Sequence, residues 1–363
     1  MIIYIDKSVG DHGRKEGLSE DEKLLFTELV IGHQRGNCLL CGDLTSIEWL
    51  MRSLGGVQGS LYRKVHSKHA ETRAILDSVE TLLVISFDEQ PNIPAFIKDK
   101  ARLFTVPQAI NYHLNEKSIL LGENLNDCKF YELLAERYLY SYPKKIKGTS
   151  LSFHHEPGGG VLTNTVFEKC VEVDKRLTLC LVDSDIKHGP TAKYPNEPSR
   201  GDTVHRLIDS ETALRKRVNA QIFELYCLPV HEVENLIPIS VLNDIANSTV
   251  RDMIPGVSYL EKLFNAGLDQ AILFYDFKNG GNKVKTDQSI TYWIEIAEMI
   301  NDDSFPYLSS KVLEKAITHL STMLPSGNKR VVSVSIENYL TPLWREIGLK
   351  VFSWGCANRP ERS

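Results

Sequence analysis

Residues 177–182, Leu-Thr-Leu-Cys-Leu-Val, run directly into Asp183-Ser184-Asp185. A short, uninterrupted apolar run bounded by polar residues predicts a strand that is buried on both faces, as in a parallel sheet. In open parallel sheets, ligands bind beyond the carboxyl ends of the strands. The two aspartates therefore stand where this class of fold places its functional groups.

The sequence on either side of this run alternates between strand-like and helix-like patterns. The neighbouring elements expected are strands at residues 118–122, 151–153 and 222–228, and helices at residues 126–140, from 163 onward, and at 204–219. This β-α-β-α-β order predicts an α/β fold with parallel strand pairing.

Acidic residues follow three of the expected strands. They are, in chain order, Glu123, Asp183 with Asp185, and Glu232 with Glu234. Because parallel strands end at one edge of their sheet, these carboxylates are expected to converge. Mg²⁺ takes oxygen ligands, commonly one or two carboxylates completed by water and substrate phosphate. The pattern therefore predicts an Mg²⁺ or Mn²⁺ site suited to phosphodiester hydrolysis.

Three segments resemble the motifs of Toprim domains. Residues 120–127, Leu-Leu-Gly-Glu-Asn-Leu-Asn-Asp, are similar to the first motif, in which an apolar strand precedes a glutamate and a helix-opening aspartate. Residues 179–185 resemble the second motif, a strand that ends in Asp-x-Asp. Residues 231–236, His-Glu-Val-Glu-Asn-Leu, are similar to the downstream acidic segment of OLD-like nucleases and related bacterial phage-defence effectors. The resemblance covers residues 117–238 and implies a central Toprim domain at 116–238.

The resemblance implies a metal-dependent endonuclease that cuts DNA or RNA, tRNA included, as an effector of bacterial antiphage defence. Glu123 would be a metal ligand or the general acid/base. Asp183 and Asp185 would be metal ligands, and Glu234, together with Glu232, would complete a second metal position.

Cationic residues follow the second motif. Lys187, Lys193 and Arg200 lie in a loop that is longer and more basic than a minimal Toprim domain needs. They are candidates for contact with the nucleic-acid backbone. Exposed loops also carry such charges for solubility alone, so the pattern leaves both interpretations open.

The sequence departs from the family pattern in two respects. Asn124 stands where the family usually has glycine, which alters how closely the backbone approaches a phosphate. No P-loop is present, so an ATPase partner would have to be a separate subunit. A regulatory partner and a homo-oligomer are further expectations. Asp127 is expected to have a structural role, because an acid in the first turn of a helix offsets the helix dipole.

Two further units are expected around the central domain. Residues 1–115 predict an N-terminal α/β domain of unknown role, and residues 239–363 a mostly helical C-terminal domain. In the first, a polar loop is expected around Gly10 and Gly13, and Ser19 with Glu22 predicts a capping box. In the second, the basic loop 278–283 is a turn or a phosphate contact, and the stretch 352–357 predicts a packed closing strand.

Composition sets weaker limits. The formal net charge of −5 does not exclude a nuclease, because the metal supplies the positive charge that faces phosphate. Seven irregularly spaced cysteines indicate reduced thiols in the cytoplasm. No apolar run is long enough to cross a membrane, so a soluble protein without membrane contact is expected.

Two other functions stay open. One is a different Toprim activity, such as primase-like nucleotidyl transfer or strand passage. The sequence shows no paired zinc-type cysteines and no recognisable tyrosine-bearing topoisomerase domain, which disfavours both. The other is a Toprim-derived sensor or scaffold that binds a partner and does not cleave. The complete set of carboxylates disfavours this second alternative.

Overall fold

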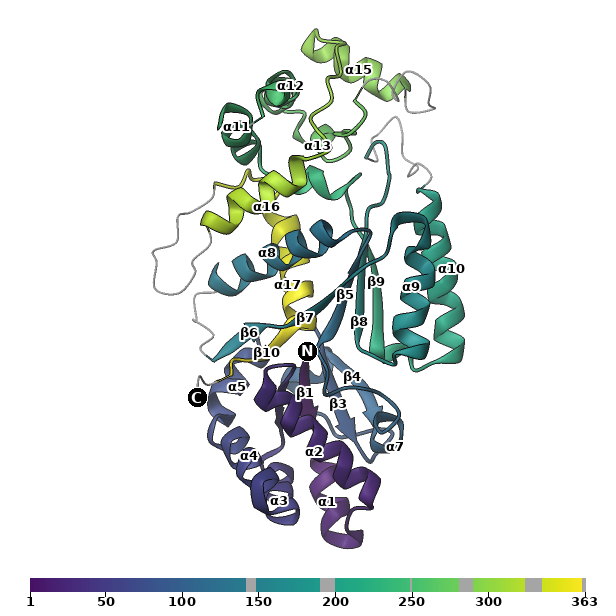
Figure 1. The fold of residues 1–363 in the computed structure, drawn as a ribbon, viewed down its shortest axis with the longest axis vertical. Helices are drawn as coiled ribbons and strands as arrows, with labels where there is room; N and C mark the ends of the chain where they lie inside the picture. Colours follow the sequence, from purple (N-terminus) through teal and green to yellow (C-terminus); the bar gives the residue numbers. More distant parts are fainter. Residues whose placement is uncertain (142–147, 190–199, 249, 281–289, 324–334, 361–363) are drawn as a thin grey trace.

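The computed structural model describes residues 1–141, 148–189, 200–248, 250–280, 290–323 and 335–360. Its two main sheets are both parallel and both four-stranded, which confirms the α/β class. The N-terminal sheet lies at one end of the molecule, the second sheet at its centre, and a group of helices at the other end (Figure 1).

The N-terminal sheet has the strand order β2-β1-β3-β4. Its strands are β1 (Ile2–Ile5), β2 (Leu39–Gly42), β3 (Leu82–Ser86) and β4 (Ala101–Thr105). The helices are α1 (Lys7–Glu16), α2 (Glu20–Arg35), α3 (Leu44–Leu54), α4 (Gly56–Ser67), α5 (His69–Leu76), α6 (Ala95–Lys98) and α7 (Val106–Ala109). The expected capping box is confirmed, because Ser19 and Glu22 bond each other's backbone N–H at the start of α2.

The prediction of a polar loop around the early glycines was wrong. Residues 7–16 form α1, which begins where the Asp6 carboxylate accepts a hydrogen bond from the Ser8 N–H (2.9 Å). A Cβ at Gly10 would lie 2.9 Å from Ser46 Cα, and one at Gly13 would overlap the Trp49 ring. The two glycines therefore let α1 pack closely on α3, and they do not mark a turn.

The central sheet has the strand order β7-β5-β8-β9. Its strands are β5 (Ser118–Gly122), β7 (Phe153–Pro157), β8 (Thr178–Val182) and β9 (Phe223–Cys227). Every pairing is parallel, as the alternating pattern predicted. Helix α8 (Leu125–Ser141) covers one face, and α9 (Thr163–Glu168) and α10 (Asp202–Arg217) cover the other (Figure 1).

The region after the central sheet is mostly helical. It begins with the 3₁₀ helix η4 (Val233–Leu236) and continues with α11 (Ile239–Ser248), α12 (Ile254–Asn265), α13 (Asp269–Ile272), α15 (Ile290–Ile300) and α16 (Val312–Met323). None of the helices in the described ranges is both long enough and apolar enough to span a membrane.

The C-terminal residues run back toward the N-terminal sheet. Helix α17 (Thr341–Gly355) packs along α8, and β10 (Cys356–Asn358) pairs antiparallel with β6 (Thr149–Leu151) (Figure 1). The closing strand expected at 352–357 was therefore largely wrong, because helical structure continues through Gly355. The expected domain boundary at residue 239 stays a prediction. Helix α17 contacts α8 beside the central sheet, and β10 contacts α2 and β2 of the N-terminal unit. The C-terminal residues therefore do not pack only with the helices that precede them.

Candidate metal centre

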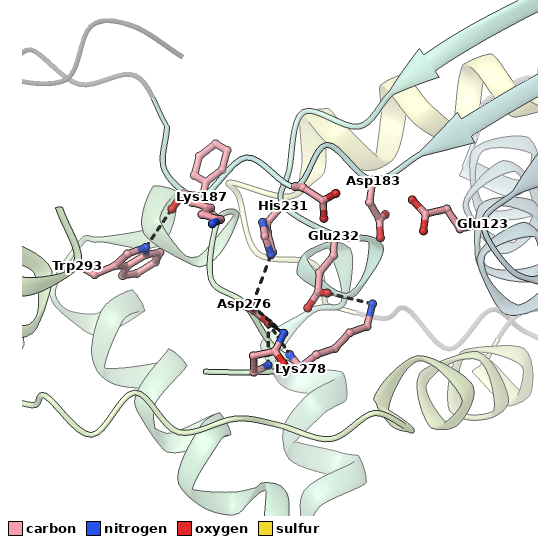
Figure 2. A pocket seen from close by; sticks show the side chains of 11 residues that line it. Glu123, Asp183, Lys187, His231, Glu232, Asp276, Lys278 and Trp293 are labelled. Atoms are coloured by element: carbon pink, nitrogen blue, oxygen red, sulfur yellow. Dashed lines mark hydrogen bonds and ion pairs between the residues drawn. The ribbon is translucent and has the colours of Figure 1, made fainter. Parts of the chain in front are cut away.

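A pocket of about 300 Å³ opens at the carboxyl edge of the central sheet, facing the helical region (Figure 2). Its lining combines five carboxylates, two lysines and one histidine with apolar and amide side chains: Glu123, Asp183, Asp185, Lys187, His231, Glu232, Phe274, Asp276, Lys278, Asn279 and Trp293. Four of the five acids expected to converge, all but Glu234, therefore line one pocket.

Glu123 enters the pocket from the turn between β5 and α8. Asn124 holds this turn, because its Oδ1 accepts hydrogen bonds from the N–H groups of Asn126 (2.9 Å) and Asp127 (3.2 Å). Asp127 Oδ2 in return accepts from the Asn124 N–H (2.9 Å). The pair caps the start of α8, which agrees with a structural role for Asp127. On the other side, the Gly159 N–H donates to the Glu123 carbonyl (2.9 Å), so three consecutive glycines at residues 158–160 lie against the same turn.

Asp183 and Asp185 leave β8 in different ways. Asp183 is 8 % exposed, and its Oδ1 accepts a hydrogen bond from the Val233 N–H at 2.9 Å. Asp185 has a left-handed backbone (φ 55°), and its side chain lies so close to Gly201 that a Cβ there would overlap the carboxylate. Its N–H donates to the His231 carbonyl (3.0 Å), which joins the ends of β8 and β9.

Glu232 and Glu234 lie at the start of η4 and are both almost completely buried. Lys278 Nζ lies 3.0 Å from Glu232 Oε2 and 3.4 Å from Glu234 Oε2. Glu232 Oε1 also accepts from the Phe277 N–H (2.9 Å). Glu234 does not line the pocket but reaches it through its contact with Lys278.

Asn235 connects the acidic segment to a distant loop. Its Oδ1 accepts from the Glu232 N–H (2.8 Å), and its Nδ2 donates to the carbonyls of Ile272 (2.7 Å) and Tyr275 (2.8 Å). These bonds place Asp276 and Lys278 beside the carboxylates. Sequence reasoning missed Asp276 and His231 and left Lys278 as a loop cation, because the backbone contacts that bring them together have no sequence pattern.

Burial and mutual repulsion make the carboxylates hard to ionise. Burial, with the charges of Asp127 and Asp185, raises the pKa of Glu123 to about 7. Burial, with the charges of Asp127 and Glu123, raises the pKa of Asp183 well above its ordinary value. The pKa of Glu232 rises to about 8, because burial and the charge of Glu234 outweigh the attraction of Lys278.

In the part of the chain that the structure describes, the Lys278 ammonium contacts two of these acids, Glu232 and Glu234. Burial works against its charge, but Glu232, Glu234 and Asp183 together raise the pKa of the ammonium above its ordinary value. Lys278 is therefore charged at neutral pH. The two lysines that line the pocket do not balance its five carboxylates, which agrees with the upward shifts in the pKa of Glu123 and Glu232.

The donor set fits a divalent cation. Carboxylate oxygens predominate, and the buried Glu234 Oε2 has the Lys278 ammonium 3.4 Å away but no hydrogen-bond partner among the described residues. Within the described ranges, one group of three acids or histidines brings its ligand atoms within 4.8 Å of one another: His231, Glu232 and Asp276. The three acids expected at the ends of β5 and β8 share the pocket but do not form so tight a group.

The structure describes two of the three cationic residues expected to contact nucleic acid, and one of them lines the pocket. Lys187 lines the pocket, and its carbonyl accepts a hydrogen bond from Trp293 Nε1 (3.0 Å). Arg200 does not line it, and its side chain interacts with the Cys227 thiol at the end of β9. Lys193 lies outside the described residues.

Comparisons of the chain with protein-family models, with curated proteins and with solved structures found no match.

Proposed function

We propose that the pocket hydrolyses phosphodiester bonds of nucleic acid with the help of Mg²⁺ or Mn²⁺, as a Toprim-type endonuclease. The observation that carries this proposal is the convergence of acids from three adjacent parallel strands: Glu123 follows β5, Asp183 follows β8, and Glu232 follows β9. A bound Mg²⁺ would neutralise charge on the phosphate and acidify a water molecule. Asp183 and Asp185 are the residues that would hold it, and Glu123 would be either a third ligand or the general acid/base.

The protein groups themselves suit this chemistry. Glu123, with its pKa raised to about 7, can exchange a proton with water or with a leaving group near neutral pH. The Lys278 ammonium is held by two buried carboxylates and faces the same pocket, where it would attract a phosphate oxygen. Lys187 supplies a second positive charge at the rim.

DNA and RNA both stay possible substrates. The proposal includes a role in bacterial phage defence, with a separate ATPase or regulatory partner. Only the resemblance to Toprim proteins supports this part of it.

One observation favours a second candidate, a pocket that binds without cleaving. Lys278 already neutralises part of the charge of Glu232 and Glu234. A Toprim-derived sensor or scaffold would need no further cation at these two acids. The two candidates differ in whether the protein turns over substrate in the presence of metal.

Cleavage of labelled DNA and total tRNA in Mg²⁺ or Mn²⁺ tests the proposal. We expect cutting by the wild type and a loss of at least about 100-fold in Glu123→Gln, which removes the ionisable group. Asp88→Asn is a matched control, because Asp88 is an exposed acid that follows β3 of the other sheet. Equal cutting by Glu123→Gln and the wild type would refute the assignment of this site.

A further inference from the structure

His231 presents one ring nitrogen to the pocket. Its Nδ1 lies 3.0 Å from the Ile186 carbonyl oxygen, and because a carbonyl only accepts hydrogen bonds, Nδ1 carries the proton. The neutral ring then has a lone pair on Nε2. The side chain is 8 % exposed, and Figure 2 shows Nε2 directed toward Asp276.

The distance between His231 and Asp276 is not that of a hydrogen bond. Nε2 lies 4.0 Å from Asp276 Oδ2, and among the described residues Nε2 has no hydrogen-bond partner. Two ligands that are each about 2.1 Å from one ion lie roughly 3–4 Å apart. The separation therefore matches a pair of groups on either side of a single cation.

The turn that follows Phe277 fixes Asp276. Its Oδ1 accepts hydrogen bonds from the N–H groups of Lys278 (3.1 Å) and Asn279 (2.8 Å), and its Oδ2 accepts from Asn279 Nδ2 (3.0 Å). These bonds hold the carboxylate in place, as the partners of a metal ligand do. The same is true of Glu232, whose Oε1 accepts from the Phe277 N–H.

We propose that His231, Glu232 and Asp276 form a second cation site that selects a divalent transition metal over Mg²⁺. Their ligand atoms lie within 4.8 Å of one another. Imidazole nitrogen suits transition metals, whereas Mg²⁺ prefers oxygen alone. The site would bind its ion whether or not the pocket cleaves nucleic acid, so it goes beyond the proposed function.

Lys278 shares one of these ligands. Its ammonium lies 3.0 Å from Glu232 Oε2, so a cation at this site and the ammonium attract the same carboxylate. Removing the ammonium should strengthen metal binding, because the cation then meets less repulsion and less competition. We expect Lys278→Met to bind Co²⁺ more tightly than the wild type, by roughly tenfold.

Titration of the full-length protein with Co²⁺ alone and with Mg²⁺ alone tests the proposal. Calorimetry gives the dissociation constants, and the visible spectrum of bound Co²⁺ reports nitrogen ligation. We expect His231→Gln to weaken Co²⁺ binding by at least about tenfold and to change the spectrum. Mg²⁺ binding is expected to stay within about twofold, because Mg²⁺ does not use the imidazole.

Two further variants keep the test decisive. Asp276→Asn retains Oδ1 as an acceptor for the turn, so the fold is preserved, and it should also weaken Co²⁺ binding. His188→Gln changes another buried histidine near the pocket, one that stacks on Tyr292, and should leave Co²⁺ affinity unchanged. Unchanged affinity and spectrum in both His231→Gln and Asp276→Asn would overturn the proposal. Selective Co²⁺ binding without any cleavage would uphold this site while contradicting the nuclease.

Discussion

Ionising the buried carboxyl of Glu123 costs free energy in the folded protein, and this cost makes the stability of the protein depend on pH. Glu123 ionises with a pKa of about 7 in the folded protein and near 4.5 when unfolded. A folded-state pKa above the unfolded value means that ionising Glu123 opposes folding. The destabilisation is absent well below pH 4.5, where Glu123 is protonated in both states, and it grows as the pH rises to about 7.

We therefore expect Glu123→Gln to be more stable than the wild type in EDTA at pH 8, by roughly 2 kcal/mol. The difference should nearly vanish at about pH 3, where the wild-type carboxyl is protonated in both the folded and the unfolded state. Urea unfolding of both proteins at the two pH values measures it. A Glu123→Gln protein less stable than the wild type at pH 8 would show that the carboxylate is favourably paired.

At the scale of elements, the turn after β5 both starts α8 and positions Glu123. Replacing Asn124 with alanine removes the acceptor for two N–H groups and should lower the free energy of unfolding by about 1 kcal/mol. Cleavage should fall as well, because the neighbouring Glu123 loses its fixed backbone. Urea unfolding and the cleavage assay measure the two effects.

Ser19→Ala is the matched control for Asn124→Ala. It removes an N-terminal cap from α2, in the N-terminal unit, and should lower stability by a similar amount of about 1 kcal/mol. Cleavage by Ser19→Ala should be unchanged. Equal loss of cleavage in both variants would mean that lost stability, and not the position of Glu123, accounts for the effect.

The elements that the sequence predicted well have strong local signals. The strand at 118–122 was predicted with the bounds observed because it is a continuous apolar run, and the helix at 126–140 was predicted to within one residue at each end because its apolar residues recur at helical spacing. Helix α1 was missed because its glycines suggest a turn, and their role depends on contact with α3. The end of α17 was misjudged because a short apolar run suits a helix as well as a strand.

The residues of the candidate site also fall into those with a local sequence signal and those without one. Glu123 and Asp183 could be predicted because they directly follow strands of one parallel sheet, and Glu232 because it lies a few residues beyond a third strand. Asp276 could not be, since its place depends on hydrogen bonds that Asn235 makes to a loop about forty residues away. The role of His231 depends on the same loop, because its N–H donates to the Leu273 carbonyl (2.8 Å). Tertiary contacts of this kind leave no periodicity in a single sequence.

At the scale of the whole molecule, a charged network joins the two sheets. Glu224 on β9 pairs with Arg102 on β4 of the N-terminal sheet and with Lys350 on α17 (2.6 Å). Lys350 also contacts Glu80, which precedes β3, at 2.7 Å. The side chains of Arg102, Glu224 and Lys350 are each at most 20 % exposed, so solvent screens these pairs weakly.

Glu224→Gln should destabilise the protein by about 3 kcal/mol, because Arg102 and Lys350 would be left in a partly buried position with less compensating charge. Lys23→Ala, which breaks the exposed Lys23–Glu20 pair, should change stability by less than about 0.5 kcal/mol. Urea unfolding compares the two. A Glu224→Gln protein as stable as Lys23→Ala would show that the network does not hold the sheets together.

The most direct test of the central claim compares the wild type with Asp183→Asn on labelled DNA and total tRNA, in Mg²⁺ and in EDTA. Asp183→Asn keeps the acceptor for the Val233 N–H and removes only the charge, so the fold is expected to persist. We predict cleavage by the wild type in Mg²⁺ alone, and a loss of at least about 100-fold in Asp183→Asn with substrate binding retained. Equal cleavage by both proteins, or cleavage that persists in EDTA, would contradict a metal-dependent nuclease at this pocket.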